Sequence, residues 1–135
     1  DLLDTEPVNG AYILKGDIFD ENMIMEIKSY LNGYADIVLS DMAAATTGHR
    51  PTDHLRTMSL LEAALDFADD VLSDSGIFLA KAFRGGADKS LLTLLNNKFE
   101  KVKHLKPPAS RVESVETYLF AKGYVGANKS KKSKN

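Results

Sequence analysis

The sequence contains no cysteine. A disulfide scaffold, a thiolate nucleophile and a zinc or iron–sulfur site bound by cysteine are therefore excluded. No apolar run approaches the roughly 20 residues that cross a bilayer, and no signal peptide opens the chain. These absences predict a soluble protein of the cytoplasm with no membrane partner.

Several catalytic motifs are also missing, among them the G-x-S-x-G elbow, the P-loop and G-x-G-x-x-G. Asp41, His49, Asp53 and His54 lie close together in the sequence, as the metal ligands of some phosphohydrolases do. Their spacing matches neither H-x-x-E-H nor H-E-x-x-H, and loop histidines are usually solvated. We therefore expect no catalytic metal.

The overall composition of the chain is typical of one globular domain. The 135 residues are 44% hydrophobic and 27% charged, which suits a single core. Residues 124–135 carry four lysines and no acid, and the rest of the chain carries 13 basic and 19 acidic side chains. We expect a folded domain over residues 1–123 and a basic, disordered tail over 124–135. The basic C-terminal third favours nucleic acid as a partner, although a solvated tail explains its last residues equally well.

Apolar patterning predicts alternating strands and helices. Short apolar runs between glycines or turn residues indicate strands, and apolar residues three or four apart after acidic capping residues indicate helices. The expected strands are Ala11–Leu14, Ala35–Ser40, Gly76–Ala82, Phe99–Leu105 and Val115–Ala121. The expected helices lie between Asp20 and Gly33, over Asp53–Leu72, and over Asp88–Asn97.

The order of these elements predicts an α/β fold. The continuous run Ala35–Ser40 is typical of a strand buried on both faces of a parallel sheet. The last two strands are connected without a helix, so they must be antiparallel if they pair. We therefore expect a doubly wound sheet with an antiparallel strand at its end.

Charged residues stand at the ends of the two strands expected to be buried. Asp41 follows the run IVLS, and Lys81 ends the run IFLA. The carboxyl ends of neighbouring parallel strands form the crevice in which ligands bind, so this placement favours a functional pair. A structural ion pair is the alternative.

Two further acids are weaker predictions. Asp17 also lies just beyond an expected strand, where acids of nucleotide-binding folds accept hydrogen bonds from ribose hydroxyls. It is explained equally well as an acid stabilised by a helix N-terminus. Glu116 alternates with two aromatic residues on the last strand, and an acid there is also compatible with a simple sheet end.

Taken in order, these residues and their neighbours closely resemble the FtsJ/RrmJ family of S-adenosylmethionine-dependent ribose 2′-O-methyltransferases of ribosomal RNA. The resemblance runs from Asp1 to about Gly123, and its most specific segment is KPPASRVESVETY. The matching residues are Ser40-Asp41-Met42-Ala43, Thr47-Gly48, Asp53, Lys81, Lys106-Pro107, Ser110-Arg111, Ser114, Glu116 and Tyr118.

The family uses a Lys-Asp-Lys-Glu catalytic tetrad, and the resemblance places its last three members on Asp41, Lys81 and Glu116. The first lysine lies upstream of a glycine-rich cofactor loop, and this sequence contains neither. The Rossmann-like methyltransferase sheet is therefore expected to lack its first strand in this chain. A lysine can remove the proton of a ribose hydroxyl, so we assign Lys81 as the general base, with Asp41 and Glu116 orienting it and the ribose.

The resemblance also implies a cofactor and a partner. S-adenosylmethionine is expected to be held by Asp1, Asp17 and Asp41, although Ala44-Ala45 replaces the Pro-Asn that the family commonly has nearby. The expected partner is ribosomal RNA or the assembled large subunit, with a uridine as the target. The residues expected to contact RNA phosphates are Arg84, Lys101, Lys103 and Arg111.

Two alternatives stay open. One is 2′-O-methylation of another RNA, such as tRNA or a cap. The other is a non-catalytic RNA-binding fragment, which the absent upstream segment favours and the presence of Asp41, Lys81 and Glu116 opposes. We expect the chain to be part of a longer protein.

Overall fold

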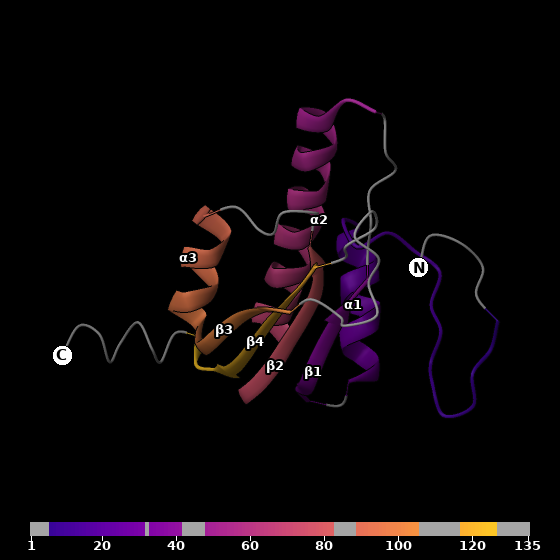
Figure 1. Cartoon of the computed structure of the whole chain (residues 1–135). Helices are drawn as coiled ribbons and strands as arrows, with labels where there is room; N and C mark the ends of the chain where they lie inside the picture. The colour runs from indigo at the N-terminus through magenta and orange to yellow at the C-terminus, as the bar shows by residue number, and fades with distance from the viewer. Residues whose placement is uncertain (1–5, 32, 42–47, 83–88, 106–116, 127–135) are drawn as a thin grey trace. The chain divides into compact units, whose positions relative to one another are not determined.

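The structure, a computed structural model, describes residues 6–31, 33–41, 48–82, 89–105 and 117–126. The chain divides into two compact units, Asp1–Tyr34 and Ala35–Asn135. The elements in chain order are α1 (Glu21–Tyr30) in the first unit and β1 (Ala35–Ser40), α2 (Arg50–Val71), β2 (Leu72–Ala82), α3 (Lys89–Lys98), β3 (Phe99–Leu105) and β4 (Thr117–Tyr124) in the second (Figure 1).

The first unit contains the expected helix but not the expected strand. Asp20 caps α1 by accepting a hydrogen bond from the Asn22 N–H at 2.9 Å. The strand predicted over Ala11–Leu14 is wrong, because these residues form no ladder and the Ala11 N–H instead bonds to the Val8 carbonyl in a turn. A strand needs a neighbour to pair its backbone groups, and the described part of this unit supplies none.

The second unit is built on a four-stranded sheet with the order β1-β2-β4-β3. β1 and β2 are parallel, and β4 pairs antiparallel with both β2 and β3. The predicted α/β fold and the antiparallel pairing of the last two strands are confirmed. β4 runs on to Tyr124, one residue past the domain boundary expected at 123, and residues 127–135 of the expected tail lie outside the described residues.

The boundaries of α2 and β2 differ from those predicted. Asp53 is not the cap of α2, because the helix begins at Arg50 after the N-cap His49 and has Pro51 in its first turn. Proline fits there since the first backbone N–H groups of a helix have no intrahelical partner. β2 begins at Leu72 rather than Gly76, and its register against β1 shifts between Leu72 and Ile77, where Ser75 has φ 66°. The residues between Leu72 and Ile77 therefore form a bulge inside the strand.

The two faces of the sheet differ in burial. Helices α2 and α3 lie side by side on one face, where they cover strand residues such as Val38, Phe78 and Leu119. Ile37 and Leu39 point the other way and are 52% and 69% exposed, so the prediction that Ala35–Ser40 is buried on both faces is wrong. Burial on both faces needs a layer on each, and the described residues of this unit supply one.

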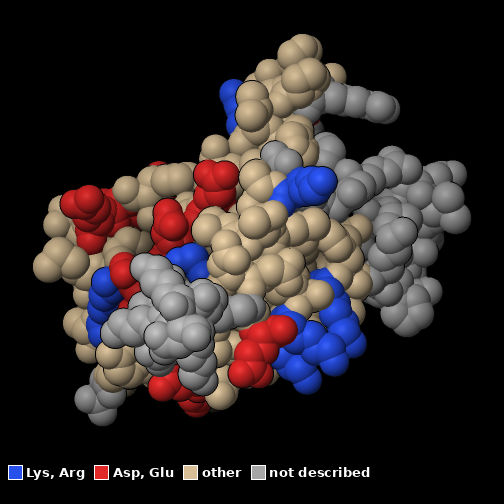
Figure 2. Space-filling model, turned by 90° about the vertical axis from the view of Figure 1, so that its left-hand side faces the viewer, with Lys and Arg blue, Asp and Glu red and all other residues tan. Residues whose placement is uncertain are grey.

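Basic residues stand on the edge strand β3 and on its neighbour β4. On the side of the molecule that carries α3 and β3, Figure 2 shows a group of Lys and Arg side chains at one place, with much of the acidic surface elsewhere. Lys101 and Lys103 of β3 and Lys122 of β4 are exposed. We name the sheet face without described helices in this unit the open face.

Gly123 turns the end of β4 toward the helices. Its φ of 75° lies in the left-handed region, and a Cβ there would approach the Glu100 side chain to 2.9 Å. The alternation of β4 breaks at this point, so Tyr124 is buried although Lys122 is exposed. Tyr124 then packs edge-on against Phe99, whose ring centroid is 5.3 Å away.

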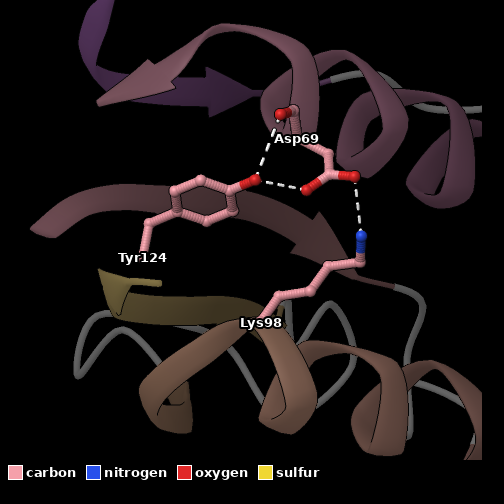
Figure 3. A network of polar contacts seen from close by, with 3 residues as sticks. All are labelled: Asp69, Lys98 and Tyr124. Atoms are coloured by element: carbon pink, nitrogen blue, oxygen red, sulfur yellow. Dashed lines mark hydrogen bonds and ion pairs between the residues drawn. The ribbon is translucent and has the colours of Figure 1, made fainter. Parts of the chain in front are cut away.

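A polar network ties α2, α3 and β4 together near these rings (Figure 3). The Tyr124 hydroxyl donates to the Asp69 carboxylate and lies 3.1 Å from the Asp69 carbonyl oxygen. Lys98 Nζ, at the end of α3, lies 2.7 Å from Asp69 Oδ2. Burial raises the pKa of Asp69, but the hydrogen bonds from Lys98 and Tyr124 outweigh it and lower the pKa below its ordinary 3.8. Burial and the neighbouring Asp69 raise the pKa of the Tyr124 hydroxyl.

Replacing Asp69 with asparagine is expected to destabilise the fold by about 1 kcal/mol at neutral pH, because charge-assisted hydrogen bonds are lost. A carboxyl whose pKa is lowered on folding contributes stability above its unfolded pKa, near 3.8, and loses it as the pH falls through the folded value. The difference in unfolding free energy between the wild type and Asp69→Asn should therefore shrink below that pH. Urea titrations over a pH series measure it.

The matched control for this experiment is Asp66→Asn, which removes the same charge from an exposed position of α2. It should leave the unfolding free energy within about 0.5 kcal/mol of the wild type. Equal effects of the two substitutions, or a difference that does not change with pH, would contradict a role for the Asp69 network.

Candidate functional site

The structure brings Asp41 and Lys81 together. Ser40, the last residue of β1, is opposite Ala80 in the parallel register of β1 and β2, so Asp41, just after β1, and Lys81, the penultimate residue of β2, lie at the same edge of the sheet. Lys81 Nζ lies 2.8 Å from Asp41 Oδ1. The lysine side chain is 22% exposed and the carboxylate 78%, so the pair lies at the surface with the amine the better shielded group.

The Asp41 carboxylate of this pair can do two things: position the Lys81 amine and accept hydrogen bonds from a ligand. The aspartate fixes the position of the amine, and most of the carboxylate surface is accessible to a ligand that donates hydrogen bonds. A surface ion pair contributes about 0–1 kcal/mol to stability, which is a weak structural reason for placing both charges at the ends of apolar strands.

β4 places an aromatic residue beside this pair. Tyr118 is opposite both Lys81 of β2 and Leu105 of β3, and it is half-buried on the open face. Thr117, the first residue of β4, is opposite Ala82 and buried. Glu116, the third expected catalytic residue, lies outside the described residues.

Asp17 lies in the turn before α1. Its Oδ1 accepts a hydrogen bond from the Phe19 N–H at 3.0 Å, and its carbonyl accepts one from the Asp20 N–H. The side chain is exposed, so its other carboxylate oxygen can accept a further hydrogen bond. Asp17 belongs to the first unit and Asp41 to the second, and each is described within its own unit.

The remaining predicted residues divide into two groups. Lys101 and Lys103 are exposed on β3, and their contact with RNA stays a prediction. Asp1, Arg84 and Arg111 lie outside the described residues.

Across the described ranges, no three His, Asp or Glu side chains come together in a way that could hold a metal ion. His49 Nδ1 is within 2.7 Å of the Thr52 hydroxyl, and Asp53 is buried in the first turn of α2. Within the same ranges, no helix is long and apolar enough to cross a membrane.

Lys122 is a basic residue that the sequence pattern does not single out. It belongs neither to β3 nor to the tail, yet the register places it directly opposite Lys101. The signal was present in the sequence, because Tyr118, Phe120 and Lys122 alternate along one strand and so share a face. Only the cross-strand register joins that face to β3.

The chain is similar in sequence to known proteins over most of its length. The family described as FtsJ-like methyltransferase matches residues 1–124. The chain is 53% identical over 124 residues to a protein of Gluconobacter oxydans named ribosomal RNA large subunit methyltransferase E, covering 92% of this chain and 46% of that protein. It is 54% identical over 126 residues to a protein of the same name from Bartonella bacilliformis, covering 93% of this chain and 53% of that protein.

A solved structure supports the fold. A crystal structure from Plasmodium falciparum, described as that of a ribosomal RNA methyltransferase, matches with a TM-score of 0.80 and 26% identity. The match covers 93% of this chain and 70% of that one. The chain spans about half the length of the curated relatives it matches.

Proposed function

Because the chain belongs to the FtsJ-like methyltransferase family, we propose that its protein transfers a methyl group from S-adenosylmethionine to a ribose 2′-hydroxyl of large-subunit ribosomal RNA. The observation that carries the proposal is the contact of Lys81 Nζ with Asp41 Oδ1 at the carboxyl ends of two parallel strands. A uridine of the assembled subunit is the proposed target, and the cytoplasm is the proposed place of action.

Lys81 is proposed to take the proton. A ribose hydroxyl is a poor nucleophile at neutral pH, so the chain must align it and provide a base. Asp41 positions Lys81 Nζ through the ion pair. Once the amine has released its own proton to solvent, it accepts the 2′-hydroxyl proton at Nζ. Glu116 is proposed to help orient the ribose.

The described acids suit the cofactor in chemical type. S-adenosylmethionine, when bound, supplies a methyl carbon already activated by the sulfonium charge. Its ribose hydroxyls and amino group are hydrogen-bond donors, and the exposed carboxylates of Asp17 and Asp41 are acceptors. Asp1 is proposed as the third acceptor.

RNA is proposed to approach over basic residues. Lys101 and Lys103 are exposed on β3, the strand beside β4. Together with Arg84 and Arg111 they are proposed to contact phosphates, which fix the position of the RNA and make binding depend on salt.

The test is methyl transfer by the full-length protein to large ribosomal subunits purified from cells that lack it. Radiolabelled S-adenosylmethionine should transfer label to the ribosomal RNA, and digestion to nucleosides should release the label in 2′-O-methyluridine. The same assay with tRNA and capped RNA as substrates is the specificity control.

The position of the label decides between the possible results. Label on a base, or on tRNA or a cap in preference to ribosomal RNA, would replace the proposed substrate. Binding of RNA with no transfer to any of these substrates would show a non-catalytic RNA-binding protein.

A further inference from the structure

Glycine follows asparagine at two places in the chain, Asn9-Gly10 and Asn32-Gly33. This order of residues permits a reaction without an enzyme, because the backbone nitrogen of the second residue can attack the side-chain amide carbon of the asparagine. A side chain on the second residue hinders that attack, and glycine has none. Asn32 lies outside the described residues, so the structure bears on Asn9-Gly10.

Asn9 and Gly10 are the two central residues of an exposed turn. The Ala11 N–H donates to the Val8 carbonyl at 3.2 Å, which closes the turn around them. Gly10 has φ 82°, a left-handed conformation that glycine adopts without strain. Both residues are exposed, and among the described residues a Cβ at Gly10 would meet no atom within 4 Å. The turn therefore presents the amide of Asn9 and the nitrogen of Gly10 to solvent.

Asn96 on α3 is the contrasting case. Its side-chain Nδ2 donates to the Leu92 carbonyl at 2.9 Å, although the residue is exposed. Asn97, which follows it, lies inside the helix. A helix binds its backbone N–H groups to carbonyls four residues back, so the nitrogen that would attack Asn96 is engaged. Exposure alone therefore does not make an asparagine reactive here, and the turn at Asn9 differs in both reacting groups.

We propose that Asn9 is a site of spontaneous deamidation in this protein. The Gly10 nitrogen gives its proton to solvent and forms a bond with Asn9 Cγ, and the side-chain nitrogen leaves as ammonia with a proton from water. The product is a five-membered cyclic imide. Water then opens the imide at either carbonyl and leaves aspartate or isoaspartate at position 9. The net reaction consumes one water and releases one ammonia.

The reaction changes the backbone of the turn as well as its charge. Both products add a negative charge to the exposed turn. Isoaspartate also carries the chain through its Cβ, which adds one backbone atom between Val8 and Ala11, inside the ring that their hydrogen bond closes. A β-turn is built from four residues of ordinary backbone, so we expect this hydrogen bond to be lost. Neither step involves methyl transfer, so the reaction goes beyond the proposed function and does not depend on it.

The experiment stores the full-length protein in mildly alkaline buffer for several weeks and digests samples with an endoproteinase that cuts before aspartate. Asp4 and Asp17 flank a peptide of residues 4–16 that contains Asn9. Isoaspartate should leave this peptide whole and about 1 Da heavier, whereas aspartate at position 9 should add a cut before that residue. Both products should increase steadily with time. Asn96, located by fragmentation in the same digest, should stay unmodified.

Two substitutions test the route of the reaction. Asn9→Gln lengthens the side chain by one carbon, so the cyclic imide would need six atoms, and the mass change should disappear over the same period. Gly10→Ala places a Cβ beside the attacking nitrogen and should slow the reaction several-fold. Thermal unfolding of both variants checks that the fold is kept.

The rates at the two asparagines decide the result. Modification of Asn9 that is no faster than that of Asn96 overturns the proposal, and this includes the case in which the rest of the full-length protein covers the turn. Aspartate without isoaspartate, or a rate unchanged in Gly10→Ala, would show direct hydrolysis and overturn the imide route. Methyl transfer is measured in its own assay, and its outcome does not alter either result.

Discussion

Lys81→Ala in the full-length protein is expected to reduce the rate of methyl transfer to ribosomal RNA by about 10²- to 10⁴-fold, the usual contribution of a positioned base. The reason is that Lys81 Nζ is the amine that Asp41 holds at the strand ends. The loss should be in kcat, with RNA affinity close to that of the wild type, since phosphates are bound elsewhere. Single-turnover transfer of radiolabelled methyl to large subunits measures it.

Stability provides the control for this variant. The Lys81–Asp41 pair lies at the surface, so breaking it should cost at most about 1 kcal/mol of unfolding free energy. Asp41→Asn should lower kcat less than Lys81→Ala, because the amine remains, and it should also weaken binding of S-adenosylmethionine, because Asp41 is a proposed acceptor for the cofactor. Lys89→Ala, the control at the start of α3, should transfer at the wild-type rate. Transfer retained in Lys81→Ala would remove Lys81 from the chemistry.

Phe99→Ala is expected to cost about 3–5 kcal/mol of unfolding free energy, the range for truncating a buried phenylalanine. Phe99 is fully buried, with its ring centroid 6.3 Å from that of Phe78 and 5.3 Å from that of Tyr124. The alanine leaves a cavity between β2, β3 and the end of β4. Since a domain of this size has about 5–15 kcal/mol in total, the loss is a large share of its stability. Urea unfolding followed by circular dichroism measures it.

Two milder substitutions keep the experiment interpretable if Phe99→Ala fails to fold. Phe99→Leu keeps most of the side-chain volume and should cost about 1–1.5 kcal/mol. Leu94→Ala removes an apolar side chain that is 40% exposed on α3 and should cost about 1 kcal/mol or less. If Leu94→Ala destabilised the chain as much as Phe99→Ala, the core would not be centred on these rings.

The local sequence pattern correctly predicts most of the strands and helices of the second unit. The apolar run Ala35–Ser40 and the segment Phe99–Leu105 are strands with the predicted bounds, and a helix follows each of β1 and β2 as expected. The prediction that charges after two parallel strands meet at one edge is confirmed in geometry by the Asp41–Lys81 contact. That success follows from the fixed direction of parallel strands, which puts their carboxyl ends together.

Local pattern failed where a segment depends on a partner. Ala11–Leu14 has the composition of a strand, but a strand forms only when a neighbour pairs its backbone. Ile37 and Leu39 have the composition of a buried run, but the described part of the second unit covers only one face of β1. The start of α2 lies before the predicted cap Asp53, because Pro51 fits the first turn of the helix and His49 takes the N-cap position.

The sequence by itself determined the α/β class, the family resemblance and the position of Asp41 and Lys81 at strand ends, because all three depend on residue order and short-range periodicity. Only the tertiary structure showed that Asp69 joins Lys98 and Tyr124, and that Lys122 faces Lys101. These contacts join residues tens of positions apart, and they depend on strand order, register and the turn at Gly123. A one-residue change of register would turn Lys122 to the other face, which is why no local pattern could determine it.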